Sequence, residues 1–427
     1  MTRLSGVIAK RLQLHLRSVT WFVSAILIVI VFATSARRST TLFDLDAAAF
    51  AGDHLAHVVD SQRVFQVYSA LSIAVDRTPA PLRLLARGLD DALPSSAIIR
   101  GNFGPTSLTS RQATPVSSSL PLDPVQVLGL FGSLLALLVT CDAVGKEREQ
   151  GTLQLVLSYP VRRSVVLLGE YIAAMLVVLV PVVLCVVLFL TISGITGRIA
   201  LDSGVLLGAA MFITALALLI STAAVTGLLI ASRVRSSTTA LTIGLFVWAL
   251  FGVVYPAVAP ALTRLIIPVD SLTSPATSDT LTKYWRNARA TTAEMRDTEQ
   301  LLQQRMVQAR LFNRLACLSP YSLYLASAES SAGTNLSSYE TFIVSEERVA
   351  AQFKKWETEK LREYPTRGFS YDMTDLPLDI TGLPANEVTV ARLQVSDAAT
   401  GVLVLLLWNA VIFGAGHITF ANYDPRP

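Results

Sequence analysis

The sequence predicts an all-α polytopic membrane protein with six transmembrane helices and a mainly helical extracytoplasmic domain. Of its 427 residues, 52% are hydrophobic and only 15% are charged, whereas soluble domains usually carry about 25% charged residues. The apolar residues gather in six long runs without Asp, Glu, Lys or Arg, and about 20 such residues are needed to cross a bilayer as a helix. This distribution excludes an ordinary cytosolic enzyme and a disordered chain.

The predicted spans follow these charge-free runs. They cover 19–36, 124–141, 165–197, 203–232, 236–263 and 398–423, and in the third span the charge-free run itself begins at Tyr171. A cleaved signal peptide is the alternative interpretation of the first run, because small residues stand at 33–36. The long basic leader and the length of the run favour a spanning helix instead.

The distribution of Lys and Arg predicts that both termini are cytoplasmic. With the N-terminus inside, the short inner segments hold eleven Lys and Arg residues, whereas the short outer loop between spans three and four holds only Arg198. Arg37 and Arg38 go against this rule, but they open a long segment, where the rule is weak. The tail at 424–427 is then cytoplasmic.

Two long segments, 37–123 and 264–397, are predicted outside. The first begins with a helical pattern and becomes irregular and proline-rich from Pro79. The second shows two apolar stripes at helical spacing, which predict helices at about 280–318 and 337–364. Ser337 and Glu340 have the spacing of a capping box at the start of the second helix. The stripes favour a small helical domain core over a binding surface.

Candidate catalytic and ligand-binding residues are scarce. One group of potential metal ligands has spacings that bring some of its members to one helical face: Asp53, His54, His57 and Asp60. A solvated helix face is favoured over a metal site as the interpretation of this group. The three cysteines form no CxxC or Cys/His cluster and are interpreted as small apolar residues. No GxxxxGK[ST], HExxH or GxSxG motif occurs. We expect no catalytic, cofactor-binding or metal-binding residue in this chain.

The segment at 142–164 is the most informative one. A charge cluster leaves the second span at Asp142, and a short amphipathic helix follows, with Leu153 and Leu157 on its apolar side. Pro160 ends this helix, and Arg162 and Arg163 are placed at the lipid headgroups. The alternative is an ordinary loop that obeys the positive-inside rule.

The motifs in this segment resemble those of the ABC-2 type exporter permeases. They are Glu147-Arg148-Glu149-x-Gly151-Thr152-Leu153, Leu157-Ser158-x-Pro160-Val161-x-Arg163 and Leu168-Gly169. The residues at 318–342 are similar to those of the NosY-like subgroup, which has large extracytoplasmic insertions. Glu170 departs from the family, which commonly has a basic residue at this position.

The resemblance implies that 142–164 is a coupling segment resting on a separate ATPase subunit. Its implied ATPase-coupling residues are Glu147, Arg148, Glu149, Gly151, Thr152, Leu153, Leu157, Pro160 and Arg163. By the same analogy, 1–18 forms a cytoplasmic interfacial helix. The sequence is compatible with this, because Leu4 and Val7 can face lipid while Lys10 and Arg11 meet the headgroups.

The implied assembly has two permease chains and two ATPase chains in a bacterial inner membrane, with ATP and Mg bound by the ATPase. This chain is then a non-catalytic permease without a cofactor of its own. Its expected partners are the ATPase, a second permease chain, the bilayer and an extracytoplasmic protein, but no nucleic acid. A charge-poor interior favours an apolar or amphipathic cargo, lipid-like or peptide. A packing role is favoured for Asn409 and His417 in the last span. The alternative function is a membrane scaffold that transmits ATP-driven motion to an extracytoplasmic partner without moving cargo.

Overall fold

Within the residues that it describes, the computed structural model confirms a mainly helical fold with six helical spans that are long and apolar enough to cross a membrane. The described residues are 2–62, 68, 71–90, 94–100, 107–109, 123–149, 163–234, 236–267, 307, 310–312, 314–365, 379–389 and 395–421. The six candidate spans are Trp21–Val59, Pro124–Cys141, Val165–Ile195, Ser203–Arg233, Ser237–Thr263 and Val395–Gly416.

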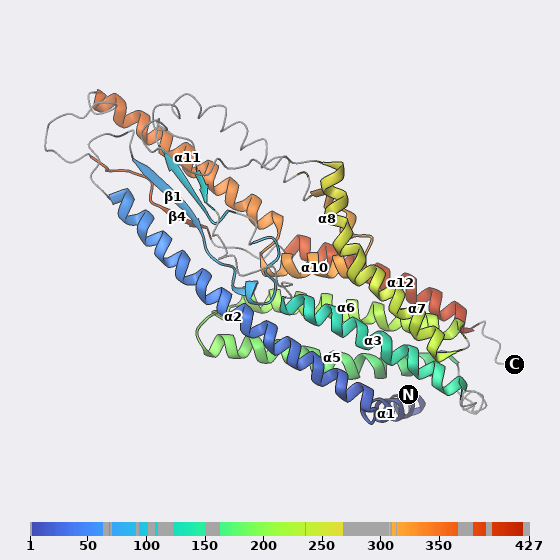
Figure 1. The fold of residues 1–427 in the computed structure, drawn as a ribbon. Helices are drawn as coiled ribbons and strands as arrows, with labels where there is room; N and C mark the ends of the chain where they lie inside the picture. The colour runs from blue at the N-terminus through green and yellow to red at the C-terminus, as the bar shows by residue number, and fades with distance from the viewer. Residues whose placement is uncertain are drawn as a thin grey trace, which may run out of the picture.

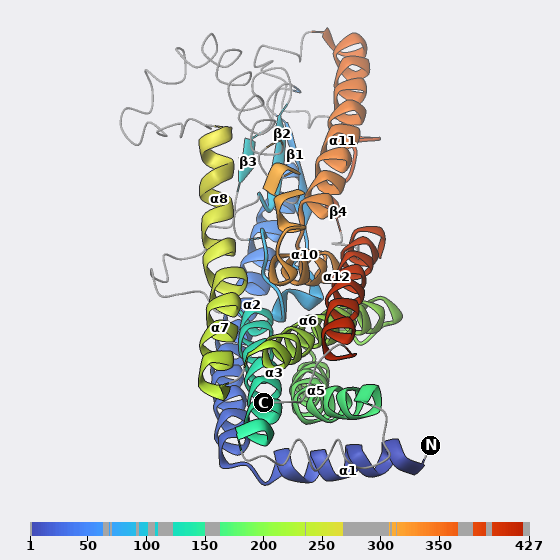
Figure 2. The same cartoon turned by 90° about the vertical axis from the view of Figure 1, so that its right-hand side faces the viewer.

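The helices α3 (Pro124–Glu149), α5 (Arg163–Ile195), α6 (Ser203–Arg233) and α12 (Val395–Ala421) pack around one apolar core. At one end of this bundle α1 (Thr2–Leu16) lies crosswise, and at the other end stands a lobe built on a small sheet (Figures 1 and 2). The placement of α1 across the end of the bundle follows from the polar residues on its exposed side. The bundle helices are apolar along their length, as helices that cross a bilayer must be.

The helix α2 (Val19–Gln62) is longer than the predicted span at 19–36. It continues without a break from the α1 end of the bundle to the lobe (Figure 1). Acidic residues beyond the apolar part find basic partners, since Asp44 binds Arg198 and Asp46 binds Arg83. The helical pattern expected at the start of segment 37–123 is therefore the upper part of the same helix.

The fifth predicted span, 236–263, is divided by a wider turn. It comprises α7 (Ser237–Ala249), the π-helical η3 (Leu250–Val254) and α8 (Tyr255–Ile266). Pro256, the second residue of α8, has no N–H to donate to this turn, and the wider turn accommodates the missing hydrogen bond. Turns of this kind occur frequently at functional sites.

The lobe contains a four-stranded sheet that the sequence patterns did not predict. Its order is β3-β2-β1-β4, with β1 (Ser72–Arg77), β2 (Ser96–Arg100), β3 (Ser107–Thr109) and β4 (Glu387–Thr389). The pair β1–β2 is antiparallel with Val75 opposite Ala97, whereas β1–β4 is parallel. The sheet packs its apolar side on α11 (Leu336–Glu363), through residues such as Phe342 and Phe353.

At two places on this side of the chain the helix ends can be compared with the expectation: the helix before Pro320 ends as predicted, whereas the cap of the next long helix differs. A helix was predicted at 280–318, of which only the last part is described; a new helix, α10 (Pro320–Ala332), then begins, with the Ser319 hydroxyl accepting from the Ser322 N–H at 3.3 Å. The predicted capping box is wrong, because Asn335 caps α11 through the Ser338 N–H at 3.2 Å. Ser337 instead donates to Asp397 and Glu340 pairs with Arg310.

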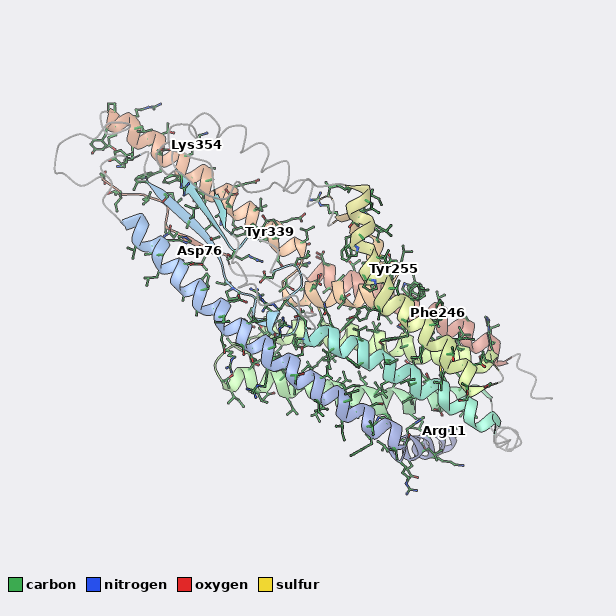
Figure 3. All side chains as sticks on the ribbon, in the orientation of Figure 1. Arg11, Asp76, Phe246, Tyr255, Tyr339 and Lys354 are labelled. Carbon is green, nitrogen blue, oxygen red and sulfur yellow. The ribbon has the colours of Figure 1, made fainter. Side chains whose placement is uncertain are left out.

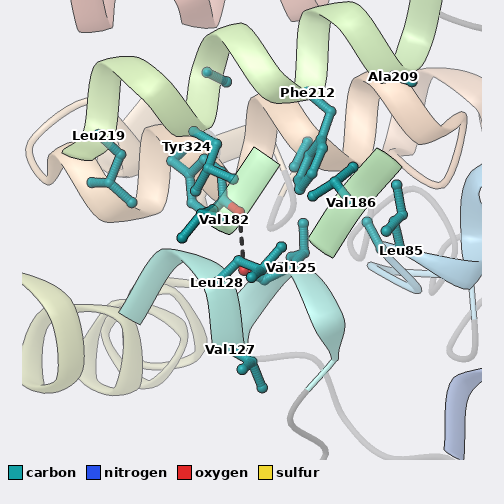
Figure 4. Close-up of a cluster of buried hydrophobic side chains, with 14 of the residues drawn as sticks. Leu85, Val125, Val127, Leu128, Val182, Val186, Ala209, Phe212, Leu219 and Tyr324 are labelled. Atoms are coloured by element: carbon teal, nitrogen blue, oxygen red, sulfur yellow. Dashed lines mark hydrogen bonds between the residues drawn. The ribbon is translucent and has the colours of Figure 1, made fainter. Parts of the chain in front are cut away.

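The bundle core connects directly to α10. Tyr324 of α10 is fully buried and donates its hydroxyl to the Val125 carbonyl at 2.9 Å, as the dashed line in Figure 4 shows. Its ring lies against Gly129, where an added Cβ would be 2.4 Å from the Tyr324 Cε1 atom. The small residue in α3 therefore permits the close approach of α10 to the bundle.

Candidate functional site

The predicted coupling residues lie between the end of α3 and the beginning of α5, next to α1. Glu147, Arg148 and Glu149 form the last turn of α3, and Arg163 is the first residue of α5. The other predicted coupling residues lie outside the described part of the chain: Gly151, Thr152, Leu153, Leu157 and Pro160. The structure thus places the two ends of this segment at the same end of the bundle.

Glu170, at the base of α5, binds two basic side chains of α1. The His15 Nε2 atom lies 2.7 Å from Glu170 Oε1, and the Arg11 Nε atom lies 3.1 Å from Oε2. The Arg11 contact is an ion pair without hydrogen-bond alignment, which leaves Oε2 without a hydrogen bond among the described residues. Glu170 is 3% exposed, so this pairing offsets the cost of burying its carboxylate.

These contacts explain why an acidic residue suits this position. Arg11 and His15 are four residues apart, so they project from one face of α1 onto α5. Figure 3 shows Arg11 at this end of the molecule. The sequence showed the acid and the two basic residues, but nothing in it indicated that segments more than 150 residues apart would meet.

A chain of hydrogen bonds begins at the next residue, Tyr171. Its hydroxyl lies 2.7 Å from the Ser221 Oγ atom, which donates to the Asn409 Oδ1 atom at 2.6 Å. The Asn409 amide donates in turn to the Thr222 hydroxyl at 2.8 Å and to the Leu218 carbonyl at 3.0 Å. These bonds join α5, α6 and α12, and they agree with the packing role expected for Asn409.

A cavity of about 190 Å³ lies beside this chain of hydrogen bonds. Thr222 belongs to both, since it binds Asn409 and also lines the cavity. The lining residues are Ser133, Leu137, Leu219, Thr222, Ala223, Thr226, Leu229, Val247, Trp248, Phe251, Gly252, Pro320, Tyr321, Trp408 and Ile412. The walls thus come from α3, α6, α7, the π-helical turn, α10 and α12, and they are almost entirely apolar.

The histidines considered as metal ligands face the sheet instead. The Nδ1 atoms of His54 and His57 lie 2.8 and 2.9 Å from the two carboxylate oxygens of Asp76, which is 1% exposed. Asp53 is exposed, and the described residues contain no group of three His, Cys, Asp or Glu that could hold a metal ion. The solvated face that is favoured from the sequence is therefore wrong for the two histidines, because they bind Asp76 and connect α2 to β1.

A second set of buried charges connects the lobe to α2. Asp90 binds Arg77 and Arg83, with the Arg83 Nη1 atom 2.7 Å from Asp90 Oδ2. Arg83 also lies 3.1 Å from Asp46 of α2. Asp90, Arg77 and Arg83 are each at most 7% exposed, so the network fixes the lobe on the long helix in one arrangement.

The fold and these sites define a polytopic membrane protein with an apolar cavity between its spans. The model of the ABC-2 family transporter proteins matches residues 8–424, nearly the whole chain. The chain therefore belongs to this family, whose members are membrane components that associate with an ABC ATPase and are normally not catalytic themselves. A search of curated proteins found no match. Membership of the NosY-like subgroup stays a prediction.

Proposed function

We propose that this chain is the permease subunit of an ABC exporter in a bacterial inner membrane, with both termini cytoplasmic. Two such chains would pair with two separate ATPase subunits, which bind ATP and Mg. The observation that carries this proposal is the family match over 8–424. It covers all six candidate spans, so it applies to the whole helical framework rather than to one motif.

The coupling route is part of the proposal. The segment at 142–164 joins α3 to α5, and Glu170 ties the start of α5 to α1 through His15 and Arg11. A partner that pushes on this segment would move α5 and α1 as one unit. The hydrogen bonds from Tyr171 through Ser221 to Asn409 would pass that motion to α6 and α12.

The proposed cargo is apolar or amphipathic, such as a lipid-like molecule or a peptide. The wall of the cavity between the spans supports this choice, because it consists of aliphatic and aromatic residues and a few hydroxyl groups. None of the described residues that line it is charged. Apolar surroundings of this kind favour hydrocarbon and disfavour ions.

The proposal is tested by co-purification with the ATPase. We expect the charge reversal Arg148→Glu to reduce recovery of the ATPase and its stimulated ATP hydrolysis at least tenfold, because a like charge in a docking surface costs several kcal/mol. Lys354→Glu on α11 is the matched control, since Lys354 is exposed in the lobe at the other end of the molecule. Equal recovery with both variants would contradict the proposed docking site.

A second function, mechanical work on an extracytoplasmic partner, is favoured by one observation. The 44-residue helix α2 is continuous from the α1 end of the bundle to the lobe, where Asp46 binds Arg83 and His57 binds Asp76 of β1. Such a continuous helix would transmit motion from the ATPase side of the bundle to the lobe, and this does not require that any cargo moves. Reconstituted vesicles distinguish the two functions: ATP-dependent movement of a labelled lipid supports export, and ATP hydrolysis without movement supports the mechanical function.

A further inference from the structure

The helices that wall the cavity between the spans also carry exposed apolar side chains. Its lining residues Val247 and Trp248 follow Phe246, which is 69% exposed on α7 (Figure 3). On α12, Trp408 lines the cavity and directly follows Leu407, which is 64% exposed. Both helices thus turn one side to the cavity and another to the exterior of the spans, where hydrocarbon surrounds a protein that crosses a bilayer.

The polar groups on the wall are occupied by the protein itself, with one exception. Thr222 and Thr226 donate to carbonyls of their own helix at 2.8 and 2.7 Å, and Ser133 donates to the Leu130 carbonyl at 3.0 Å. The indole N–H of Trp248 donates to Ser133 at 3.1 Å, and that of Trp408 to the Cys317 carbonyl at 3.2 Å. These groups are therefore not free to bind water, and apolar cavities without free polar groups stay dry.

The exception is Tyr321 at the start of α10. Its side chain is 5% exposed and lines the cavity. Its hydroxyl has no hydrogen-bond partner among the described residues, unlike the neighbouring Tyr324, which donates to the Val125 carbonyl. A buried phenol usually finds a partner, so this hydroxyl is available to a molecule in the cavity.

The volume limits what can bind. An apolar cavity of about 150 Å³ holds a benzene-sized molecule, whereas pockets for whole drug-sized ligands measure about 300–1,000 Å³. At about 190 Å³, this cavity accepts part of one hydrocarbon chain but no headgroup. Tyr321 lies in the first turn of α10, the helix that stands between the bundle and α11 of the lobe (Figure 1), and it is the place where such a chain would present its first polar atoms.

We infer that the cavity binds one acyl chain of a bilayer lipid and that Tyr321 donates a hydrogen bond to the ester carbonyl of that chain. The juxtaposition of apolar walls, wall-forming helices with exposed apolar sides and one unpartnered buried phenol carries this inference. The inference deepens the proposed function by naming a lipid as the bound molecule. Only one part of it rests on that function, namely that the bound lipid is the cargo.

Fluorescence quenching tests the site, because Trp248 and Trp408 lie on its wall. The full chain in detergent is titrated with a phosphatidylcholine whose acyl chains are brominated, without ATPase or nucleotide. We expect a saturable quenching phase in the wild type. Ala223→Phe should abolish it by filling the cavity, whereas Ala210→Phe, on the exposed side of the same helix, should retain it. Equal saturable quenching in both variants would overturn the site.

The phenol has its own test, which does not depend on a variant that disturbs packing. Tyr321→Phe keeps the ring and removes only the hydroxyl, so it should weaken binding of the brominated ester lipid about two- to tenfold, as expected for one hydrogen bond. A brominated alkane without an ester should bind wild type and Tyr321→Phe equally. Unchanged binding of the ester lipid would overturn the role of Tyr321.

These results separate the inference from the proposed function. Saturable lipid binding together with absent ATPase association would contradict the permease proposal and leave the lipid site in place. The opposite outcome has two parts: the wild type transports in an ATP-dependent manner, and the Ala223→Phe variant binds the lipid as well as the wild type does. That outcome would contradict the lipid site and leave the permease proposal in place.

Discussion

Glu170 of α5 holds the N-terminal helix through His15, whose Nε2 atom lies 2.7 Å from the Glu170 carboxylate. The contact joins the first helix of the chain to the first turns after the segment at 142–164. Any movement of that segment therefore acts on α1 as well as on α5. The acidic residue that departs from the family pattern is explained by this pairing.

Replacing the carboxylate should release α1. In Glu170→Gln, the largely buried Arg11 guanidinium loses the charge of Glu170, and breaking a buried pair costs about 3–5 kcal/mol. We expect hydrogen exchange in α1 to accelerate while the α6 core remains protected. The charge swap Glu170→Arg with Arg11→Glu should restore part of the protection. Unchanged exchange in Glu170→Gln would show that the pair does not hold α1.

The close approach of α10 to α3 gives a packing prediction. In Gly129→Ala the new Cβ would lie 2.4 Å from the Tyr324 Cε1 atom, so the ring must move and its bond to the Val125 carbonyl is disturbed. We expect a loss of about 1–3 kcal/mol in thermal stability. Gly132→Ala is the control, because its Cβ would meet Ile220 Cδ1 at 3.4 Å. Equal stability of the two variants would contradict the packing argument.

The buried charges of the lobe should matter more than exposed ones. Asp90→Asn leaves Arg77 and Arg83 without their shared carboxylate and should destabilise the lobe by about 3 kcal/mol or more. Asp44→Asn removes a pair with Arg198 that is largely solvent-exposed, which should cost at most about 1 kcal/mol. Limited proteolysis of the lobe measures the difference, and similar cleavage rates for both would contradict it.

Glu329 on α10 gives the lobe end of the bundle a dependence on pH. Burial, and then the charge of Asp123, raise the pKa of Glu329 to about 8. The folded state therefore binds this proton more tightly than the unfolded state, so the stability falls as the pH rises from about 4.5 towards 8. We expect Glu329→Gln to match the wild type near pH 4 and to exceed it by about 2 kcal/mol near pH 9, since the side chain keeps some solvent contact. Thermal melting of both proteins at the two pH values measures this difference. The same stability difference between wild type and Glu329→Gln at pH 4 and pH 9 would contradict the prediction.

The membrane part of the fold could be predicted from the sequence because one physical rule dominates it. Charged groups are costly in hydrocarbon, so charge-free runs mark the spans directly. The continuation of α2 into the lobe was less visible, since its upper part is polar and its partners, Arg83 and Arg198, come from distant segments.

The sheet and the sites could not be predicted in the same way. The strands β3 and β4 are only three residues long, and β4 pairs in parallel with β1 from more than 300 residues away. No periodicity can be read from three residues. The cavity likewise depends on how six elements meet, and Tyr321 and Trp248 show no spacing that relates one to the other.

The most direct measurement of the central claim is ATPase activity in the complex after deletion of 151–157. The account predicts that a chain with this deletion still inserts, keeps the Glu170 contact and the α3–α6 core, and yet no longer recruits or stimulates the ATPase. Full recruitment and full stimulated hydrolysis by the inserted deletion variant would contradict it.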